Sequence, residues 1–457
     1  MALIKSISGI RGTIGGRPGE NLTAQDVVEC TAAFGQWIRA NGAKPRVVIG
    51  RDARISGAWM QALVTQTLLS LGIDVVDLGL STTPTVEMAV PEEGAGAGII
   101  LTASHNPRQW NALKFLNAKG EFISAADGRA ILDSIEAGAI DYADVDHFGQ
   151  YIARSGAIER HIGTIMKMPL VHTDAVRKRG FKVVVDAVNS TGALSVPPLL
   201  AAMGCEVVVI NGEPNGDFAH NPEPLPHHLT ALCERVVAEK ADLGIAVDPD
   251  VDRLAFVSEN GVFFGEEYTL VAVADYVLGH RSGNTVSNLS STRALRDVTE
   301  KHGGQYFASA VGEVNVVEKM KAVRAVIGGE GNGGVIVPDL HYGRDALAGI
   351  ALFLSHLAET GLKMSELRAT YPDYAMVKDK IALTPEVDLP AILEKIHDKY
   401  RHEQCNTIDG LKIDFAEGWV HLRKSNTEPI IRVYAESTSE AAARNLVEKI
   451  KKDALGG

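Results

Sequence analysis

Residues 98–107 read GIILTASHNP, and the fold class follows from this stretch and its counterparts elsewhere in the chain. The apolar run 98–101 is short and flanked by glycine, which predicts a strand buried in a mostly parallel sheet. In open α/β sheets, polar ligand sites lie just past the carboxyl ends of strands, and Ser104 follows the strand in this way. A plain turn would also use Ser, Asn and Pro, so the segment alone leaves both interpretations open.

The same succession of strand, small polar loop and helical stretch occurs three times along the chain. The copies open with RVVIGRD, KVVVDAVN and NTVSNLS, at residues 46–52, 182–189 and 284–290. In each copy a later strand runs into an unusual loop, at 102–107, 248–253 and 328–334. Strands that alternate with helices indicate βαβ units with parallel pairing. We therefore predict three similar α/β domains with mixed, mostly parallel sheets.

The last part of the chain lacks this repeat. Its predicted elements are a segment at 376–383, a charged helix at 390–400, a hairpin at 411–423, a strand at 430–434 and a final helix at 439–451. This pattern is typical of a smaller α+β domain. The expected domains are therefore 1–155, 156–256, 257–369 and 370–457.

Composition limits the class of protein. A chain of 457 residues is too long for one core, and it contains no apolar run that could span a bilayer. The N-terminal residues lack the hydrophobic region of a signal peptide, and the four cysteines are scattered, so we expect a cytoplasmic protein with free thiols. The formal charge of −12 argues against binding to nucleic acid or to an anionic membrane surface.

The loop 248–253, which reads DPDVDR, predicts a metal site. The carboxylates of Asp248, Asp250 and Asp252 repel one another unless a cation is present, and hard oxygen ligands suit Mg²⁺ or Ca²⁺. An EF-hand is excluded because Arg253 replaces the required glycine and the next residues read as a strand. A haloacid-dehalogenase nucleophile would need Gly-Thr after its second aspartate. A polar turn at a strand end is the alternative that is left.

The loop 328–334, GGEGNGG, contains Gly-x-Gly-x-x-Gly, which by itself is weak evidence for a dinucleotide site. A short strand follows where a Rossmann fold needs a helix, so we reject that interpretation. We expect the glycines, Gly331 among them, to let the backbone approach a ligand, with Glu330 and Asn332 reading it. A flexible hairpin turn is the alternative.

The segment 423–432, RKSNTEPIIR, is rich in groups that bind phosphate. Its candidate ligands are Arg423, Ser425, Asn426, Thr427 and Arg432. A surface turn between two strands is the alternative interpretation. Two further cations are candidate site residues. Arg11 lies in a glycine-flanked turn, and Lys114 could reach back to a group on Ser104.

Taken together, the four loops resemble those of the α-D-phosphohexomutases. The form of the loop 328–334 found here is most similar to that of phosphoglucosamine mutase-like proteins. The resemblance covers nearly the whole length. It implies that Ser104 carries a phosphoryl group and that Mg²⁺ is bound by Ser104, Asp248, Asp250 and Asp252. It also implies three α/β domains and a smaller fourth domain around a central cleft, with Arg11, Lys114 and Arg253 assisting catalysis.

The chain departs from many relatives in the sugar loop, where Asn332 and Gly334 replace a serine and a histidine, and at Glu313, where a histidine is common. The loss of both histidines and the gain of acid suit an aminosugar at least as well as a neutral hexose, and the resemblance of this loop to phosphoglucosamine mutase-like proteins implies the aminosugar. We expect interconversion of glucosamine 6-phosphate and glucosamine 1-phosphate, with a 1,6-bisphosphosugar as activator. A phosphomannomutase or phosphoglucomutase of the same mechanism is the alternative, and a non-catalytic phosphosugar-binding protein is a third. The expected partner is the small phosphosugar, and the chain would be a monomer or homodimer.

Overall fold

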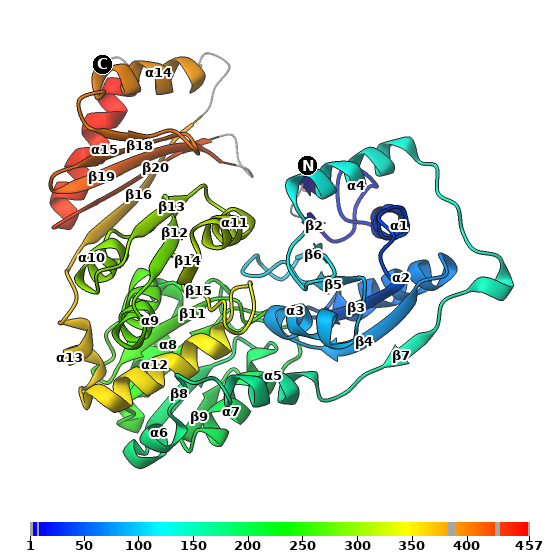
Figure 1. Cartoon of the computed structure of the whole chain (residues 1–457), viewed down its shortest axis with the longest axis horizontal. Helices are drawn as coiled ribbons and strands as arrows, with labels where there is room; N and C mark the ends of the chain where they lie inside the picture. The colour runs from blue at the N-terminus through cyan, green and yellow to red at the C-terminus, as the bar shows by residue number, and fades with distance from the viewer. Residues whose placement is uncertain (1–2, 7–8, 383–388, 426–429, 456–457) are drawn as a thin grey trace.

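The computed structural model describes residues 3–6, 9–382, 389–425 and 430–455, which form four sheets (Figure 1). The first sheet has the order β1-β2-β6-β5-β3-β4-β7. Its strands are β1 (Leu3–Ser6), β2 (Gly9–Thr13), β3 (Arg46–Arg51), β4 (Asp74–Leu80), β5 (Ala97–Leu101), β6 (Trp110–Leu116) and β7 (Tyr151–Ala153). The second has the order β11-β10-β8-β9, with β8 (Lys182–Asp186), β9 (Glu206–Ile210), β10 (Leu243–Val247) and β11 (Leu254–Ser258). The third has the order β13-β12-β14-β15, with β12 (Asn284–Asn288), β13 (Tyr306–Ser309), β14 (Ala325–Glu330) and β15 (Gly334–Ile336).

These three sheets confirm the predicted α/β class and share one topology. In each, the first strand of the copy (β3, β8 or β12) lies between two parallel partners. An antiparallel strand (β6, β11 or β15) then adds to the third strand of the copy. The three special loops are therefore reversals at the carboxyl ends of β5, β10 and β14.

Helices cover the sheets on both faces, which explains the near-continuous apolar strands. In β3, Val47 and Ile49 enter one core while Val48 enters another on the opposite face. The helices of this part of the chain are α1 (Ala24–Ala40), α2 (Gly57–Ser70), α3 (Thr83–Glu92), α4 (Ala125–Ala137), α5 (Ala157–Ile165), α6 (Thr173–Arg179), α7 (Gly192–Ala202), α8 (Thr230–Glu239), α9 (Glu266–His280), α10 (Ala294–Lys301), α11 (Glu313–Val323), α12 (Ala346–Thr360) and α13 (Met364–Arg368).

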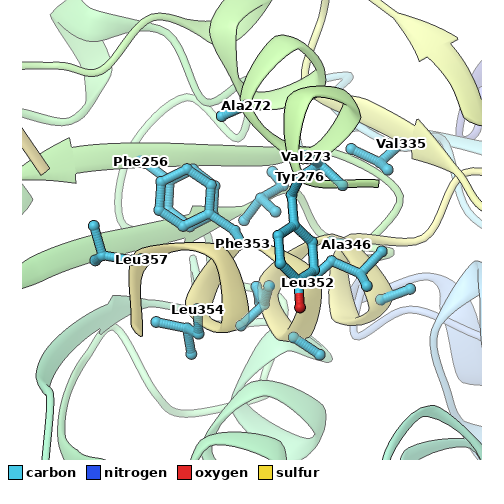
Figure 2. Close-up of a cluster of buried hydrophobic side chains, with 14 of the residues drawn as sticks. Phe256, Ala272, Val273, Tyr276, Val335, Ala346, Leu352, Phe353, Leu354 and Leu357 are labelled. Atoms are coloured by element: carbon cyan, nitrogen blue, oxygen red, sulfur yellow. The ribbon is translucent and has the colours of Figure 1, made fainter. Parts of the chain in front are cut away.

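The second and third sheets share one continuous core, centred on α12. This helix is apolar on nearly all sides and is buried, as expected for a helix without a polar face. Figure 2 shows Phe353 of α12 beside Phe256 of β11, and their ring centroids lie 4.0 Å apart. Tyr276 of α9 lies in the same cluster. The two sheets are thereby fastened to each other, while the first sheet has cores of its own.

The fourth sheet is antiparallel and confirms the α+β expectation for the C-terminal part. Its order is β16-β20-β19-β18-β17, with β16 (Ala375–Ala382), β17 (Gln404–Asn406), β18 (Leu411–Phe415), β19 (Gly418–Lys424) and β20 (Ile430–Ser437). Helices α14 (Leu389–Lys399) and α15 (Glu440–Leu455) share its core (Figure 1). Among the described residues, no helix is long and apolar enough to cross a bilayer.

Candidate active site

Ser104 lies just beyond β5, as the sequence predicts, and its backbone is left-handed, with φ of 49°. Its amide donates to Thr102 Oγ1 at 2.9 Å, which helps to hold this uncommon conformation. Its hydroxyl donates to Asp248 Oδ2 at 2.7 Å. The loops after β5 and β10, which are 144 residues apart in sequence, therefore meet at the serine hydroxyl.

Arg54, which the sequence analysis did not single out, holds the serine loop in place. It is 1 % exposed and forms an ion pair with buried Asp52 at 2.9 Å. Its guanidinium also donates to the carbonyl oxygens of Ser104, Asn106, Pro107 and Trp110. One side chain thus fixes four points of the loop, and we assign it a positioning role.

Asp248, Asp250 and Asp252 are fully buried, and they offer carboxylate oxygens that all lie within 4.8 Å of one another. The backbone between them is strained, because Val251 is β-branched and adopts φ of 64°. The amides of Asp252 and Arg253 donate to Asp248 Oδ1 and so close the loop. Burial, together with Asp252 and Asp250, raises the pKa of Asp248 well above its usual range.

This loop fits a metal ion. Asp250 Oδ1 and Asp252 Oδ1 are buried and have no hydrogen-bond partner among the described residues. Leaving an ionised oxygen buried without a partner costs several kcal/mol, at least about as much as an unmade charged hydrogen bond. A divalent cation would satisfy both atoms, and the all-oxygen donor set suits a hard ion.

Lys114, on β6, faces the same carboxylates. Its Nζ lies 2.9 Å from Asp250 Oδ2 and 3.8 Å from Asp252 Oδ2. Burial would lower the pKa of Lys114, but Asp250 and Asp252 outweigh it and the pKa is raised, so the ammonium stays charged. Arg11, on the neighbouring strand β2, is the cross-strand partner of Ala112 on β6. Its side chain therefore lies on the same face of the sheet as that of Lys114. Burial lowers the pKa of Arg11, which has no ion pair among the described residues.

Glu330, at the end of β14, is buried, and its carboxylate is already in use. Oε1 accepts from Asn288 Nδ2 and from the amide of Gly312, and Oε2 accepts from Arg344 at 3.1 Å. Burial would raise the pKa of Glu330, but Arg344 outweighs it and the pKa is lowered. Asn332 uses its Oδ1 to accept from the amide of Gly334.

Packing within the protein gives a further reason for the glycines of this loop. A Cβ on Gly331 would stand 1.9 Å from Glu267 Oε2, and one on Gly333 would stand 2.2 Å from the carbonyl oxygen of Leu254. Gly333 also has φ of +85°. The glycines are therefore needed where the protein's own backbone and side chains pack against the loop, and their close approach to a ligand stays a prediction.

Arg344 connects the predicted sugar loop, 328–334, with the predicted metal loop, 248–253. The sequence analysis did not single it out. Its guanidinium contacts Asp252 at 2.6 Å, Glu313 at 3.0 Å and Glu330 at 3.1 Å. Glu313, predicted to add acid to the site, is indeed there, and burial raises its pKa. The acidity expected from Glu313 and Glu330 is therefore partly neutralised by one arginine.

Arg253 also lies at this centre. Its Nη1 lies 3.4 Å from Glu223 Oε1, and its Nε is buried without a hydrogen-bond partner among the described residues. Burial, with Arg253 and Arg344 nearby, lowers the pKa of His105 well below its usual value. The imidazole is thus neutral, and the positive charge of the centre resides on arginine and lysine.

The predicted phosphate segment presents paired arginines. Arg423 of β19 and Arg432 of β20 are direct cross-strand partners, and Arg432 donates to Ser425 Oγ at 3.3 and 3.4 Å. Arg423 Nη1 also lies 3.9 Å from Asp409 Oδ2, and two guanidinium groups placed opposite each other could share one phosphate. Asn426 and Thr427 lie outside the described residues.

A second buried polar chain connects the three α/β parts close to Arg344. Asp345 caps α12 and lies 2.8 Å from His161 of α5 and 3.2 Å from His341. His341 in turn lies 3.2 Å from Glu87 of α3. Its carboxylate neighbours raise the pKa of His341 to about 10, although burial opposes this, and burial raises that of Glu87 to about 8.

Of the predicted site residues, the structure brings together Ser104, the three aspartates, Lys114, Arg253, Glu330 and, through Arg344, the loop that carries Asn332. Arg344 could have been suspected from its place in Gly-Arg-Asp before an apolar helix, but Arg54 sits in an ordinary-looking turn. Arg54 therefore carries no signal of its own in the sequence, and that of Arg344 is weak.

Comparison with protein families gives four consecutive matches. The phosphoglucomutase/phosphomannomutase alpha/beta/alpha domains I, II and III match residues 3–140, 159–261 and 265–374. The C-terminal domain of the same family matches residues 375–453. The four matches therefore follow one another along almost the whole chain.

Curated relatives are similar over nearly their full lengths. A probable phosphoglucosamine mutase of Methanopyrus kandleri is 35% identical over 96% of this chain and 95% of that protein. A phosphoglucomutase/phosphomannomutase of Thermococcus kodakarensis is 36% identical, with coverage of 98% and 99%. A phosphoglucosamine/phosphogalactosamine mutase of Sulfurisphaera tokodaii is 33% identical, with coverage of 99% of both. Among solved structures, a phosphoglucomutase/phosphomannomutase family protein of Burkholderia thailandensis has a TM-score of 0.86 at 27% identity, covering 99% of this chain and 98% of its own.

Proposed function

The chain belongs to the phosphoglucomutase/phosphomannomutase family of α-D-phosphohexomutases, and from this premise we propose that it interconverts glucosamine 6-phosphate and glucosamine 1-phosphate through a phosphorylated Ser104. The observation that carries the proposal is the 2.7 Å hydrogen bond from Ser104 Oγ to Asp248, in a loop whose other carboxylates face Lys114. A nucleophile, a cation site and a lysine in contact are the parts that phosphoryl transfer requires.

In the proposed reaction, the free hydroxyl oxygen of the sugar phosphate attacks the phosphorus atom on Ser104. The bond from phosphorus to Ser104 Oγ breaks, the sugar hydroxyl gives up its proton and Oγ regains one. The products are a sugar 1,6-bisphosphate and free serine. The bisphosphate turns end for end, and transfer in the reverse sense returns the other phosphate to Ser104.

The residues of the site have separate tasks. Mg²⁺, held by Asp248, Asp250, Asp252 and the phosphoryl group of Ser104, would supply positive charge to the transferring group. Lys114 and Arg253 add fixed charge on the same side, and Arg11 is placed on the sheet face of Lys114 to do likewise. Lys114 and Arg11 are cations, so they would assist deprotonation by stabilising negative charge on the attacking oxygen, and the proton that the sugar hydroxyl loses balances the one that Ser104 Oγ takes up. Loss of phosphate from Ser104 would stop turnover, so a 1,6-bisphosphosugar is the expected activator.

The phosphate that does not react needs a holder. Arg423 and Arg432, with Ser425, Asn426 and Thr427, take this role in the proposal, because two arginines side by side can grip one phosphate through several parallel hydrogen bonds. When these residues bind either the 1-phosphate or the 6-phosphate at a fixed place, the other end of the sugar faces Ser104.

The choice of glucosamine rests on charge. Glu313 and Glu330 set two carboxylates against the one guanidinium of Arg344, which Asp252 of the metal loop also contacts, so negative charge is in excess around the sugar loop. An ammonium on the sugar would be attracted there, while Glu330 or Asn332 could accept from sugar hydroxyls. Glucose or mannose phosphate would be a weaker substrate of the same mechanism.

Two experiments test the proposal. Intact mass should show one phosphoryl group on a fraction of wild-type molecules and none on Ser104→Ala, which should fold normally and lose nearly all mutase activity. Wild-type turnover by Ser104→Ala would refute the phosphoserine mechanism. Specificity constants for glucosamine, glucose and mannose 1-phosphates should favour the aminosugar, and a preference for either neutral sugar would overturn the substrate while leaving the mechanism intact.

A further inference from the structure

A group of metal-ligating side chains lies outside the catalytic elements, where the second and third sheets join. It comprises His172, immediately before α6, His280 at the end of α9, and Glu359 near the end of α12. One potential ligand atom from each residue lies within 4.8 Å of the others. The three side chains are between 34% and 37% exposed, so an ion from solution could reach them and water could complete its shell.

The hydrogen bonds around His280 prepare one nitrogen for a cation. Its Nδ1 lies 3.0 Å from the carbonyl oxygen of Tyr276, which can only accept, so the proton is on Nδ1. Nε2 then faces Glu359 Oε2 at 3.4 Å without a hydrogen bond between them. A ligating histidine commonly donates its second nitrogen to a backbone carbonyl in this way.

Glu359 uses one oxygen for each imidazole. Oε1 accepts a hydrogen bond from His172 Nδ1, which a bound cation would replace, and Oε2 faces His280 Nε2. The hydroxyl of Tyr276 also stands 3.4 Å from Oε1, but its single proton is closer to the carbonyl oxygen of Leu170, at 2.9 Å. The carboxylate of Glu359 and the lone pair of His280 Nε2 therefore face each other, with room for a cation to bind both. The C-terminal ends of α9 and α12 add the negative ends of two helix dipoles.

We propose that His172, His280 and Glu359 bind a divalent ion of the zinc class, which ties the segment before α6 to the ends of α9 and α12. Two imidazole nitrogens and one carboxylate oxygen are a donor set that suits Zn²⁺ and does not suit Mg²⁺. Bonds of about 2.0–2.1 Å in a tetrahedral shell place neighbouring ligand atoms about 3.3 Å apart. The 3.4 Å between His280 Nε2 and Glu359 Oε2 agrees with that spacing. The ion would have a structural role.

The test uses the full-length protein, stripped with chelator and then kept in excess Mg²⁺ so that the aspartate loop is filled. Zn²⁺ affinity is measured by competition with a chromophoric indicator, and Co²⁺ is added as a spectroscopic probe. Wild type should bind one Zn²⁺, give the intense visible bands of four-coordinate Co²⁺ with nitrogen ligands, and unfold at a higher temperature with Zn²⁺. His280→Gln and Glu359→Gln should each weaken Zn²⁺ by at least about tenfold and lose those bands.

His402→Gln, a change at an exposed histidine outside the group, is the matched control and should behave as wild type. Mutase activity should be equal in all variants, because none of these residues touches the catalytic loops. Equal Zn²⁺ binding by wild type and both site variants would overturn the proposal. So would weak six-coordinate Co²⁺ bands in wild type, since the three residues would then form only an imidazole–carboxylate ion pair.

Discussion

Replacing Arg54 with methionine is expected to damage both stability and catalysis, although Arg54 touches no substrate in the proposed reaction. The change leaves the fully buried carboxylate of Asp52 without its partner and removes the donor for four loop carbonyls. Breaking a buried ion pair from one side costs about 3–5 kcal/mol. That loss is a large fraction of the free energy of unfolding of a typical domain, so urea unfolding should detect it readily.

The catalytic effect has a separate cause. Without the guanidinium, the loop that carries Ser104 is free to shift, and a displacement of about 1 Å at a reacting group costs about a hundredfold in rate. We therefore expect kcat to fall by about that factor, with a smaller change in KM. A coupled mutase assay run below the unfolding transition measures both constants.

A double variant separates the two effects. Asp52→Asn combined with Arg54→Met removes the uncompensated charge, so stability should recover by at least about 1 kcal/mol over the single variant, while kcat stays low. Arg46→Met is the matched control, because Arg46 pairs with the partly exposed Asp74 on the same sheet and should cost at most about 1 kcal/mol without affecting turnover. Wild-type turnover by Arg54→Met would refute the positioning role.

Three further predictions follow from the same contacts. Arg344→Met should lower kcat/KM by about a hundredfold or more. Arg344→Lys should lower it by less, because lysine keeps the charge but cannot form the paired hydrogen bonds of the guanidinium. Equal kinetics in both variants and wild type would contradict this prediction. Asp250→Asn should raise the Mg²⁺ needed for half-maximal activity and cut activity by orders of magnitude, and full wild-type activity in excess chelator would exclude the metal. The pKa of His341 is raised from 6.5 to about 10, so its stabilising charge is complete below pH 6.5 and is lost as pH rises through about 10. The free energy of unfolding should fall between pH 7 and 10 in wild type and fall less in His341→Gln, and parallel curves would contradict the assignment.

The sequence predicted the repeat because each copy carries its own local pattern. Arg46, Lys182 and Asn284 each begin a strand whose parallel partners follow at similar spacing, and parallel pairing then leaves few arrangements. The candidate site was visible for the same reason, since the groups within each loop are neighbours in sequence. The domain boundaries and the individual roles of the site residues stay predictions.

The residues that were missed act across long distances in sequence. Arg344 meets Asp252 over 92 residues, and Arg54 meets the serine loop over about fifty. Nothing local marks such a side chain, because its partners are brought to it only by the packing of separate sheets. The packing role of the glycines was missed for the same reason, since Glu267 and Leu254 approach the loop from other elements.

The shared topology explains why the three tasks that we propose fall on equivalent loops. In each copy the third parallel strand is followed at once by an antiparallel strand, so the chain must reverse at the carboxyl edge of the sheet. Tight reversals of this kind tolerate left-handed backbone, which Ser104 and Val251 adopt. Contacts such as Ser104–Asp248 and Arg344–Asp252 then join the three edges. The proposed nucleophile, metal loop and sugar loop can therefore differ in side chains while the scaffold that brings them together stays the same.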